Sequence, residues 1–159
     1  MRKAEREITD RGEIDAILSD TTICRIAFAV ENEPYLVPLS HGYDARAGRL
    51  FFHTAVEGRK SDCVVANPRV CFEVEGSVSV KEGDERACSW SLHYESVIGY
   101  GTIRELTNPA EKEEALRVIM RQQSARDLEW TFLPKVFEAT RVWSLEIESV
   151  TGKRSGRPR

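Results

Sequence analysis

Residues 50–60 read Leu50-Phe51-Phe52-His53-Thr54-Ala55-Val56-Glu57-Gly58-Arg59-Lys60. The aromatic start is typical of a β-strand, and this strand ends in His53 and Thr54. Two consecutive cations follow a glycine at the start of a helix-sized segment, residues 58–68. The first amides of a helix point outwards and its dipole favours negative charge, while Arg59 can grip a phosphate with two hydrogen bonds and Lys60 adds a point charge. The stretch therefore suits an anion.

Each of these residues also has a purely structural interpretation. An Arg-Lys pair at a helix start is more often plain surface charge. His53 is either a half-buried strand histidine bonded to a neighbour or the natural proton donor of the chain near neutral pH. The other histidines, His41 and His93, show no spacing typical of a catalytic triad. The sequence contains no Gly-x-Ser-x-Gly elbow, Walker loop or dinucleotide fingerprint.

Alternating apolar residues and turn signals on either side of this stretch predict a mainly β protein. Strands are expected at residues 22–30, 35–43, 50–54, 70–75, 91–106 and 142–150. Helices are expected after Thr9-Asp10, over 58–68, from Pro109 onwards and over 132–138, with a loop or an irregular hairpin at 76–89. Six strands with few helices exclude an alternating βαβ fold, and the first three predict an antiparallel meander. The pattern alone leaves a sandwich and a barrel equally open.

Two features within the predicted strands indicate irregularity. Pro38 cannot donate to a ladder, so it predicts an edge or an interruption in the second strand. Gly99 and Gly101 predict a bend in the long fifth strand, with a bulge or a close backbone approach.

The length, composition and charge of the whole chain limit the class of protein and the compartment expected for it. At 159 residues with 41% apolar and 31% charged residues, one globular domain spanning 1–159 is expected, with flexible ends at 1–10 and 154–159. A net charge of −3 argues against general nucleic-acid binding, and the basic C-terminal end is interpreted as a solvated tail (Lys153, Arg154, Arg157, Arg159). No apolar run approaches the roughly 18–20 residues of a membrane span, and the charged start is no secretory signal, so we expect a cytoplasmic protein away from membranes.

Cysteine usage fits the same compartment. The four cysteines, Cys24, Cys63, Cys71 and Cys88, form no Cys-x-x-Cys pair, which favours reduced thiols packed as small apolar groups. Cys88 and His93 lack further ligands at a recognisable spacing, so no metal site is expected.

Several motifs in order resemble one protein family. Leu50 to Ala55, Gly58-Arg59-Lys60 and Asn67-Pro68-Arg69-Val70 resemble the pyridoxamine 5′-phosphate oxidase-like flavoproteins, in particular their nitroimidazole-resistance (Nim) branch. The segments 37–43 and 94–101 are similar to the strands before and after these motifs. Val142 to Lys153 is similar to the last strand of the family with its Thr-Gly-Lys close.

The resemblance implies a six-stranded antiparallel split β-barrel of Greek-key type, which forms a homodimer and binds FMN at the subunit interface. By this resemblance Pro38, Leu39 and Ser40 would lie along the flavin ring, and His53 and Thr54 would border the ring and its ribityl chain. Arg59 and Lys60 would take the phosphate. Tyr94 and Ser96 would contribute from the long strand across the dimer, and His53 matches the active-site histidine of Nim-type proteins.

One departure affects the expected activity. The family commonly has Tyr-Arg-Ser where this chain has Tyr94-Glu95-Ser96, so an anion replaces a cation. The first functional hypothesis is an FMN-dependent oxidoreductase that passes electrons to a small acceptor such as a nitro-aromatic, with NADH or NADPH as donor and His53 as proton donor. The alternatives are a flavin- or haem-binding storage or sensor module without turnover, and a cofactor-free structural dimer.

Overall fold

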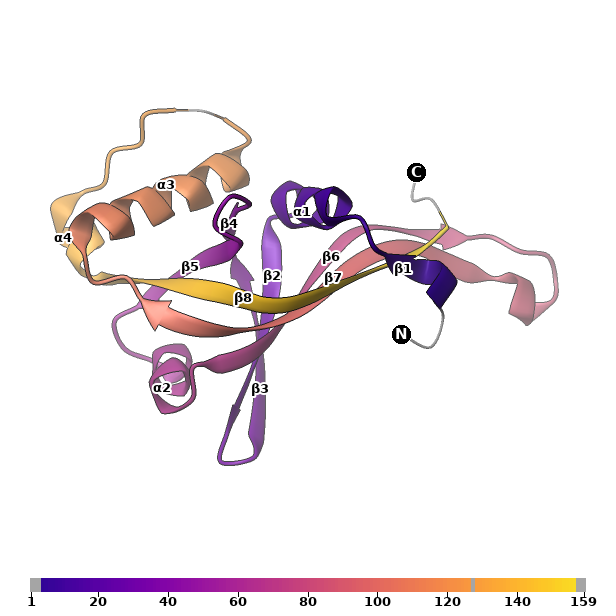
Figure 1. The fold of residues 1–159 in the computed structure, drawn as a ribbon, viewed down its shortest axis with the longest axis horizontal. Helices are drawn as coiled ribbons and strands as arrows, with labels where there is room; N and C mark the ends of the chain where they lie inside the picture. The colour runs from indigo at the N-terminus through magenta and orange to yellow at the C-terminus, as the bar shows by residue number, and fades with distance from the viewer. Residues whose placement is uncertain (1–3, 127, 157–159) are drawn as a thin grey trace.

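The computed structural model describes residues 4–126 and 128–156 (Figure 1). The strands in chain order are β1 (Glu7–Ile8), β2 (Ile23–Val30), β3 (Glu33–Ser40), β4 (Gly42–Asp44), β5 (Arg49–Ala55), β6 (Arg69–Lys81), β7 (Ser91–Glu105) and β8 (Thr140–Ser155). The helices are α1 (Arg11–Asp20), α2 (Arg59–Ala66), α3 (Pro109–Ser124) and α4 (Pro134–Glu138), with short 3-10 turns at Ala4–Arg6 and Ala87–Ser89. The predicted strands and helices are confirmed in type, with shifted ends.

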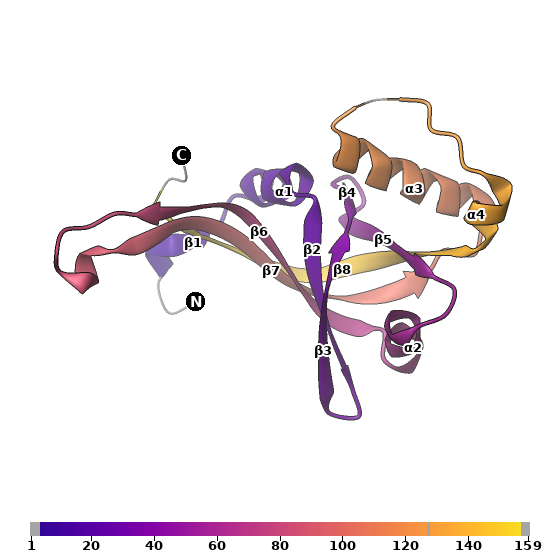
Figure 2. The same ribbon diagram turned by 180° about the vertical axis from the view of Figure 1, so that it is seen from behind.

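The strands form one antiparallel sheet in the order β3-β2-β6-β7-β8-β5-β4, with β1 paired to β8. In Figures 1 and 2, β2 and β3 cross the long ribbons of β6, β7 and β8 at a steep angle, so the single sheet coils around its core as an open barrel. The count is eight strands rather than the expected six. One addition is β1, where Glu7 and Ile8 pair with Lys153 and Gly152 in a segment expected to be a flexible end.

The second addition arises because the strand predicted over 35–43 is divided at His41. Its first part, β3, pairs with β2 along its whole length, and its second part, β4, pairs with β5. The expected meander is therefore interrupted, since β3 and β4 lie at opposite ends of the strand order. Pro38 lies on β3, an edge strand, as its missing N–H predicted.

The segment 76–89, expected to be a loop or an irregular hairpin, forms an irregular hairpin. β6 continues through a register shift between Glu75 and Val78 as far as Lys81, opposite the start of β7. The two strands project from the body of the molecule as a long hairpin (Figures 1 and 2). Alternation of Val78 and Val80 carried the strand signal, which the neighbouring polar residues obscured.

One of the two glycines expected to make β7 irregular, Gly101, lies at a register shift. Between β7 and β8 the register shifts at Tyr100/Gly101, which confirms the predicted bulge. A Cβ added at Gly101 would lie 2.2 Å from the Glu146 carbonyl oxygen, so only glycine permits this approach.

Local capping explains where the helices begin. The Asp10 carboxylate accepts from the Glu13 amide at 2.9 Å at the start of α1, and the Asn108 side chain accepts from Ala110 at 2.9 Å at the start of α3. Pro109 occupies the first turn of α3, as predicted. No helix in the described ranges has both the length and the apolar character needed to cross a membrane.

The core is divided between the two faces of β5. Phe52 belongs to the main cluster inside the coiled sheet, where it stacks with Trp143, whereas Phe51 belongs to a second cluster beneath α3. Burial on both faces explains why the aromatic start of this strand shows no alternation. All four cysteines are free, and of these Cys24 and Cys63 are buried and Cys88 is exposed.

Candidate functional site

The turn between β5 and α2 has an unusual helix start. Gly58 precedes α2 with a φ of 131° and a ψ of 163°, a conformation open essentially to glycine alone. Glycine brings no side chain to cap the first turn, and no other side chain among residues 4–126 and 128–156 caps it. The amides of Arg59, Lys60 and Ser61 therefore face outwards beside two cationic side chains, which is the chemistry of an anion site.

Hydrogen bonds of the Thr54 hydroxyl hold this turn in place. Its hydroxyl is buried, donates to the Ala55 carbonyl at 2.8 Å, lies 3.1 Å from the Ser61 hydroxyl, and accepts from the Trp143 indole N–H at 3.0 Å. Ser61 is buried as well and donates to the same carbonyl at 3.2 Å. These bonds join the end of β5 to the first turn of α2, so the anion site has a rigid base.

Arg59 is held from the side by Tyr35, a residue that sequence reasoning missed. The guanidinium carbon lies 4.3 Å from the Tyr35 ring centre, and that ring stacks on the buried Phe28 at 6.0 Å. Tyr35 belongs to β3 and stands 24 positions before Arg59, so no local pattern links them. Together these elements enclose a cavity of about 140 Å³. At roughly 30 Å³ per water, this volume suits a group of about five heavy atoms.

His53 points away from this cavity. It lies between Phe52 and Thr54 in the strand, so its side chain leaves the opposite face of β5, where it is exposed. Partial desolvation, together with the nearby Lys60 charge, lowers the pKa of His53 below its usual value near 6.5. The imidazole is therefore mainly neutral at pH 7.

The three predicted ring-side residues lie at the end of β3. Leu39 is buried in the main core, while Pro38 and Ser40 are exposed on the other face of this edge strand. They share β3 with Tyr35, and β3 packs against β5 although the two strands are not paired. One chain therefore assembles β3, the end of β5 and the start of α2 into a continuous region.

Tyr94 and Ser96 lie elsewhere. Tyr94 pairs with Val78 beyond the register shift of β6, in the projecting hairpin, and Ser96 pairs with Lys153 of β8. Lys153 lies 5.7 Å from the Tyr94 ring centre. In both views this part of β7 extends away from α2 (Figures 1 and 2). A single chain therefore does not bring Tyr94 and Ser96 to Arg59 and Lys60.

Glu95 faces the other side of β7 from Tyr94 and Ser96. Its carboxylate accepts from the Arg154 Nε at 3.1 Å, and Arg154 also donates to Glu13 of α1 at 2.7 Å. The anion that departs from the family pattern is thus tied to α1 and β8 and does not lie on the face that carries Ser96.

Comparison with known proteins identifies the family of the chain. The sequence profile described as pyridoxamine 5′-phosphate oxidase matches residues 10–154. The chain belongs to the pyridoxamine 5′-phosphate oxidase family. The split-barrel fold expected from the resemblance is confirmed, and the eight strands are a variation on it. No functionally curated protein is significantly similar in sequence.

Solved structures of similar fold carry several descriptions. A putative 5-nitroimidazole antibiotic resistance protein from Bacteroides thetaiotaomicron superimposes with a TM-score of 0.80 at 26% identity, over 92% of this chain and 85% of that one. An FAD-binding protein from Mycobacterium smegmatis has a TM-score of 0.59 at 25% identity, over 94% and 99%. A flavocytochrome from Azotobacter vinelandii has a TM-score of 0.79 at 22% identity, over 100% and 74%.

Proposed function

We propose that this pyridoxamine 5′-phosphate oxidase family member binds FMN, with its phosphate at the start of α2. The observation that carries the proposal is the helix start at Gly58, which lacks a side-chain cap and is flanked by Arg59 and Lys60. The open space at Gly58, where an added Cβ would touch nothing, leaves room for a phosphate against the amides. The described binding of FAD by one similar structure supports a flavin. The nitroimidazole-resistance description of another supports a nitro-aromatic acceptor.

In this proposal Arg59 and Lys60 bind the phosphate, and Thr54 with Ser61 holds the turn in place. Pro38, Leu39 and Ser40 border the ring from the edge of β3. Tyr94 and Ser96 come from a second copy of the chain, because their own copy carries them away from α2. The functional unit is then a homodimer with composite sites.

The activity proposed is an oxidoreductase that reduces a small acceptor such as a nitro-aromatic, with NADH or NADPH as electron donor. Bound FMN would supply the electron transfer. The chain supplies binding and orientation. His53 is mainly neutral and leaves the face of β5 opposite the α2 cavity, and it is the group proposed to exchange a proton near neutral pH in the dimeric site.

The visible spectrum of the purified protein tests the cofactor. We expect flavin absorption bands, and we expect Arg59→Ala/Lys60→Ala to weaken FMN binding by well over about tenfold while riboflavin binding changes little. The matched control, Arg126→Ala/Lys135→Ala, removes two exposed cations outside the site and keeps wild-type affinity. A colourless protein that FMN neither colours nor stabilises against heating would overturn the proposal.

Anaerobic mixing tests turnover separately. The flavin-loaded protein is mixed with NADH or NADPH and then with a nitro-aromatic, and flavin reduction and reoxidation are followed by absorbance. Reduction and acceptor turnover are expected for the oxidoreductase. Bound flavin with neither reaction would instead indicate a storage or sensor module. Turnover that survives His53→Ala would remove His53 from the mechanism.

A further inference from the structure

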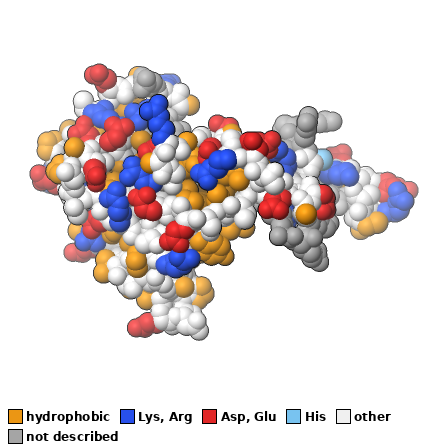
Figure 3. All heavy atoms as spheres, in the orientation of Figure 1, with side chains coloured by type: hydrophobic (Ala, Val, Ile, Leu, Met, Phe, Trp, Pro, Cys, Tyr) orange, Lys and Arg blue, Asp and Glu red, His pale blue; other side chains and the backbone are white. Residues whose placement is uncertain are grey.

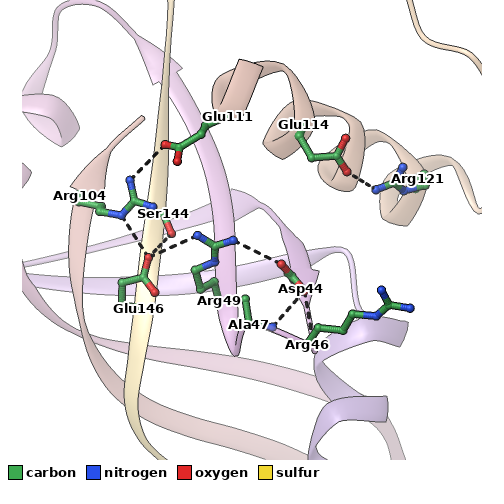
Figure 4. Close-up of polar contacts among 10 residues, drawn as sticks. All are labelled: Asp44, Arg46, Ala47, Arg49, Arg104, Glu111, Glu114, Arg121, Ser144 and Glu146. Carbon is green, nitrogen blue, oxygen red and sulfur yellow. Dashed lines mark hydrogen bonds and ion pairs between the residues drawn. The ribbon is translucent and has the colours of Figure 1, made fainter. Parts of the chain in front are cut away.

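A second and larger cleft lies on the opposite side of β5 from the α2 cavity. It opens between α3 and the turn that joins β4 to β5, and its volume is about 890 Å³, within the usual range of small-molecule sites. Figure 4 shows polar side chains from α3, this turn and strands β5, β7 and β8, among which Arg49 lies between Asp44 and Glu146. The proposed flavin function uses none of them.

The floor of this cleft is apolar. Phe51 and Leu106 are buried members of the second core cluster, and Ala115 of α3 closes the same surface, with Val118 half-buried beside it. An apolar ligand body placed here would extend an existing core and would not create an isolated contact.

Arg49 stands over this floor with much of its hydrogen-bonding capacity unused. Its guanidinium lies 5.2 Å from the Phe51 ring centre, and its Nη atoms reach Asp44 and Glu146 only at 3.5 and 3.9 Å. Its Nε is buried and, among residues 4–126 and 128–156, has no hydrogen-bond partner. A guanidinium offers five N–H donors in a planar fork that matches a carboxylate.

The acidic groups around the cleft are engaged at shorter distances. Asp44 accepts from the amides of Arg46 and Ala47 at 3.1 and 3.2 Å, and Glu114 accepts from Arg121 at 2.9 Å. The side chain of Arg46 forms no ion pair within the described part of the chain. Figure 3 shows the same alternation of Lys and Arg with Asp and Glu over the α3 end of the molecule. The hydrogen-bonding groups that stay free in the cleft therefore belong to cationic side chains. The carboxylates around them would repel a dianion.

We propose that this cleft binds a small organic monocarboxylate with an apolar or aromatic body. The carboxylate takes the Nη donors of Arg49 that its long contacts with Asp44 and Glu146 leave free. The body lies on Phe51, Leu106 and Val118. A monocarboxylate fits better than a phosphate because Asp44 and Glu114 lie close by, and one under-bonded fork matches one carboxylate.

Calorimetric titration of the full-length protein with 2-naphthoate tests this site. Saturable binding of one molecule per chain is expected, with much weaker binding of the neutral analogue 2-naphthylmethanol. Arg49→Lys keeps the charge but removes the fork, and it should weaken binding about tenfold. Ala110→Trp places a bulky side chain on an exposed cleft position and should abolish binding without touching either arginine.

The controls keep the outcome independent of the flavin. Arg59→Ala/Lys60→Ala should bind 2-naphthoate as the wild type does, and Arg126→Ala serves as a charge-matched control outside the cleft. Thermal melting shows that each variant is folded, and Ala110→Trp decides the matter if Arg49→Lys does not fold. The proposal fails if the intact protein shows no saturable binding, or if Ala110→Trp and folded Arg49→Lys bind 2-naphthoate as tightly as the wild type.

Discussion

The guanidinium carbon of Arg59 lies 4.3 Å from the centre of the Tyr35 ring, and this contact joins the start of α2 to the edge strand β3. Arg59 is otherwise a long side chain at an exposed helix start. The Tyr35 ring therefore restricts the position of the Arg59 charge, as expected for a side chain that binds an anion at the helix start.

Replacing Tyr35 should weaken phosphate binding selectively. Tyr35→Leu removes the cation–π contact, worth about 0.5–2 kcal/mol, so FMN affinity should fall roughly twofold to thirtyfold. Tyr35→Phe retains the ring and should retain the affinity. Titrations of FMN and riboflavin, followed by flavin fluorescence, check this. Equal loss of both ligands in Tyr35→Leu would mean that the ring acts on the barrel and not on Arg59.

Removing the Thr54 hydroxyl should destabilise the fold itself. Thr54→Val keeps the shape but leaves the Trp143 indole N–H without its acceptor, at a cost of about 1–3 kcal/mol in the free energy of unfolding. Trp143→Phe should also destabilise, and the double variant should cost less than the sum of the two. Urea unfolding measures all three. Strict additivity would contradict a shared hydrogen bond.

His41 should make stability depend on pH. It is almost fully buried, its Nε2 lies 3.1 Å from the Leu18 carbonyl, and its Nδ1 finds no partner within the described residues. Burial lowers the pKa of His41 below its usual 6.5. The unfolded chain then binds this proton more readily, so stability is complete above about pH 6.5 and falls as the pH drops below that value, by up to about 1.4 kcal/mol per pH unit.

Urea unfolding between pH 8 and pH 5 measures this slope. His41→Leu should flatten it, whatever its effect on stability at pH 8. His53→Leu is the comparison, because the pKa of His53 is lowered in the same direction at an exposed position, and it should remove less of the slope. A slope that persists in full in His41→Leu would assign it to other groups.

Restoring the family cation at position 95 should harm this chain. Glu95→Arg would place two cations side by side, since Glu95 lies 3.1 Å from the Arg154 Nε, and we expect a loss of about 1 kcal/mol in the free energy of unfolding. The exchanged pair Glu95→Arg/Arg154→Glu should recover part of it. Flavin affinity should change little in either variant, because both residues face α1.

Local signals were sufficient to predict most of the elements. Asn108-Pro109 predicted the start of α3 because its capping is completed within four residues. The division at His41 could not be predicted in this way, since it depends on distant groups. Gln122 and Gln123 of α3 bond to His41 and to carbonyls at the end of α1, and they turn the chain out of β3. Tyr35 escaped prediction for the same reason, whereas Arg59 and Lys60 were predicted because an anion site at a helix start is local.

Burial of β5 on both faces has a consequence for folding. A slip by one position would exchange Phe51 for Phe52, so the aromatic half of the strand hardly discriminates between the native pairing and its neighbour. The polar half does, because the slip would drive His53 into the core and leave the Trp143 indole without Thr54. His53 and Thr54, at the end of the strand that leads into the proposed cofactor site, thus also specify the strand register of the sheet. Substitutions there should raise the yield of misassembled chains before they alter the finished fold.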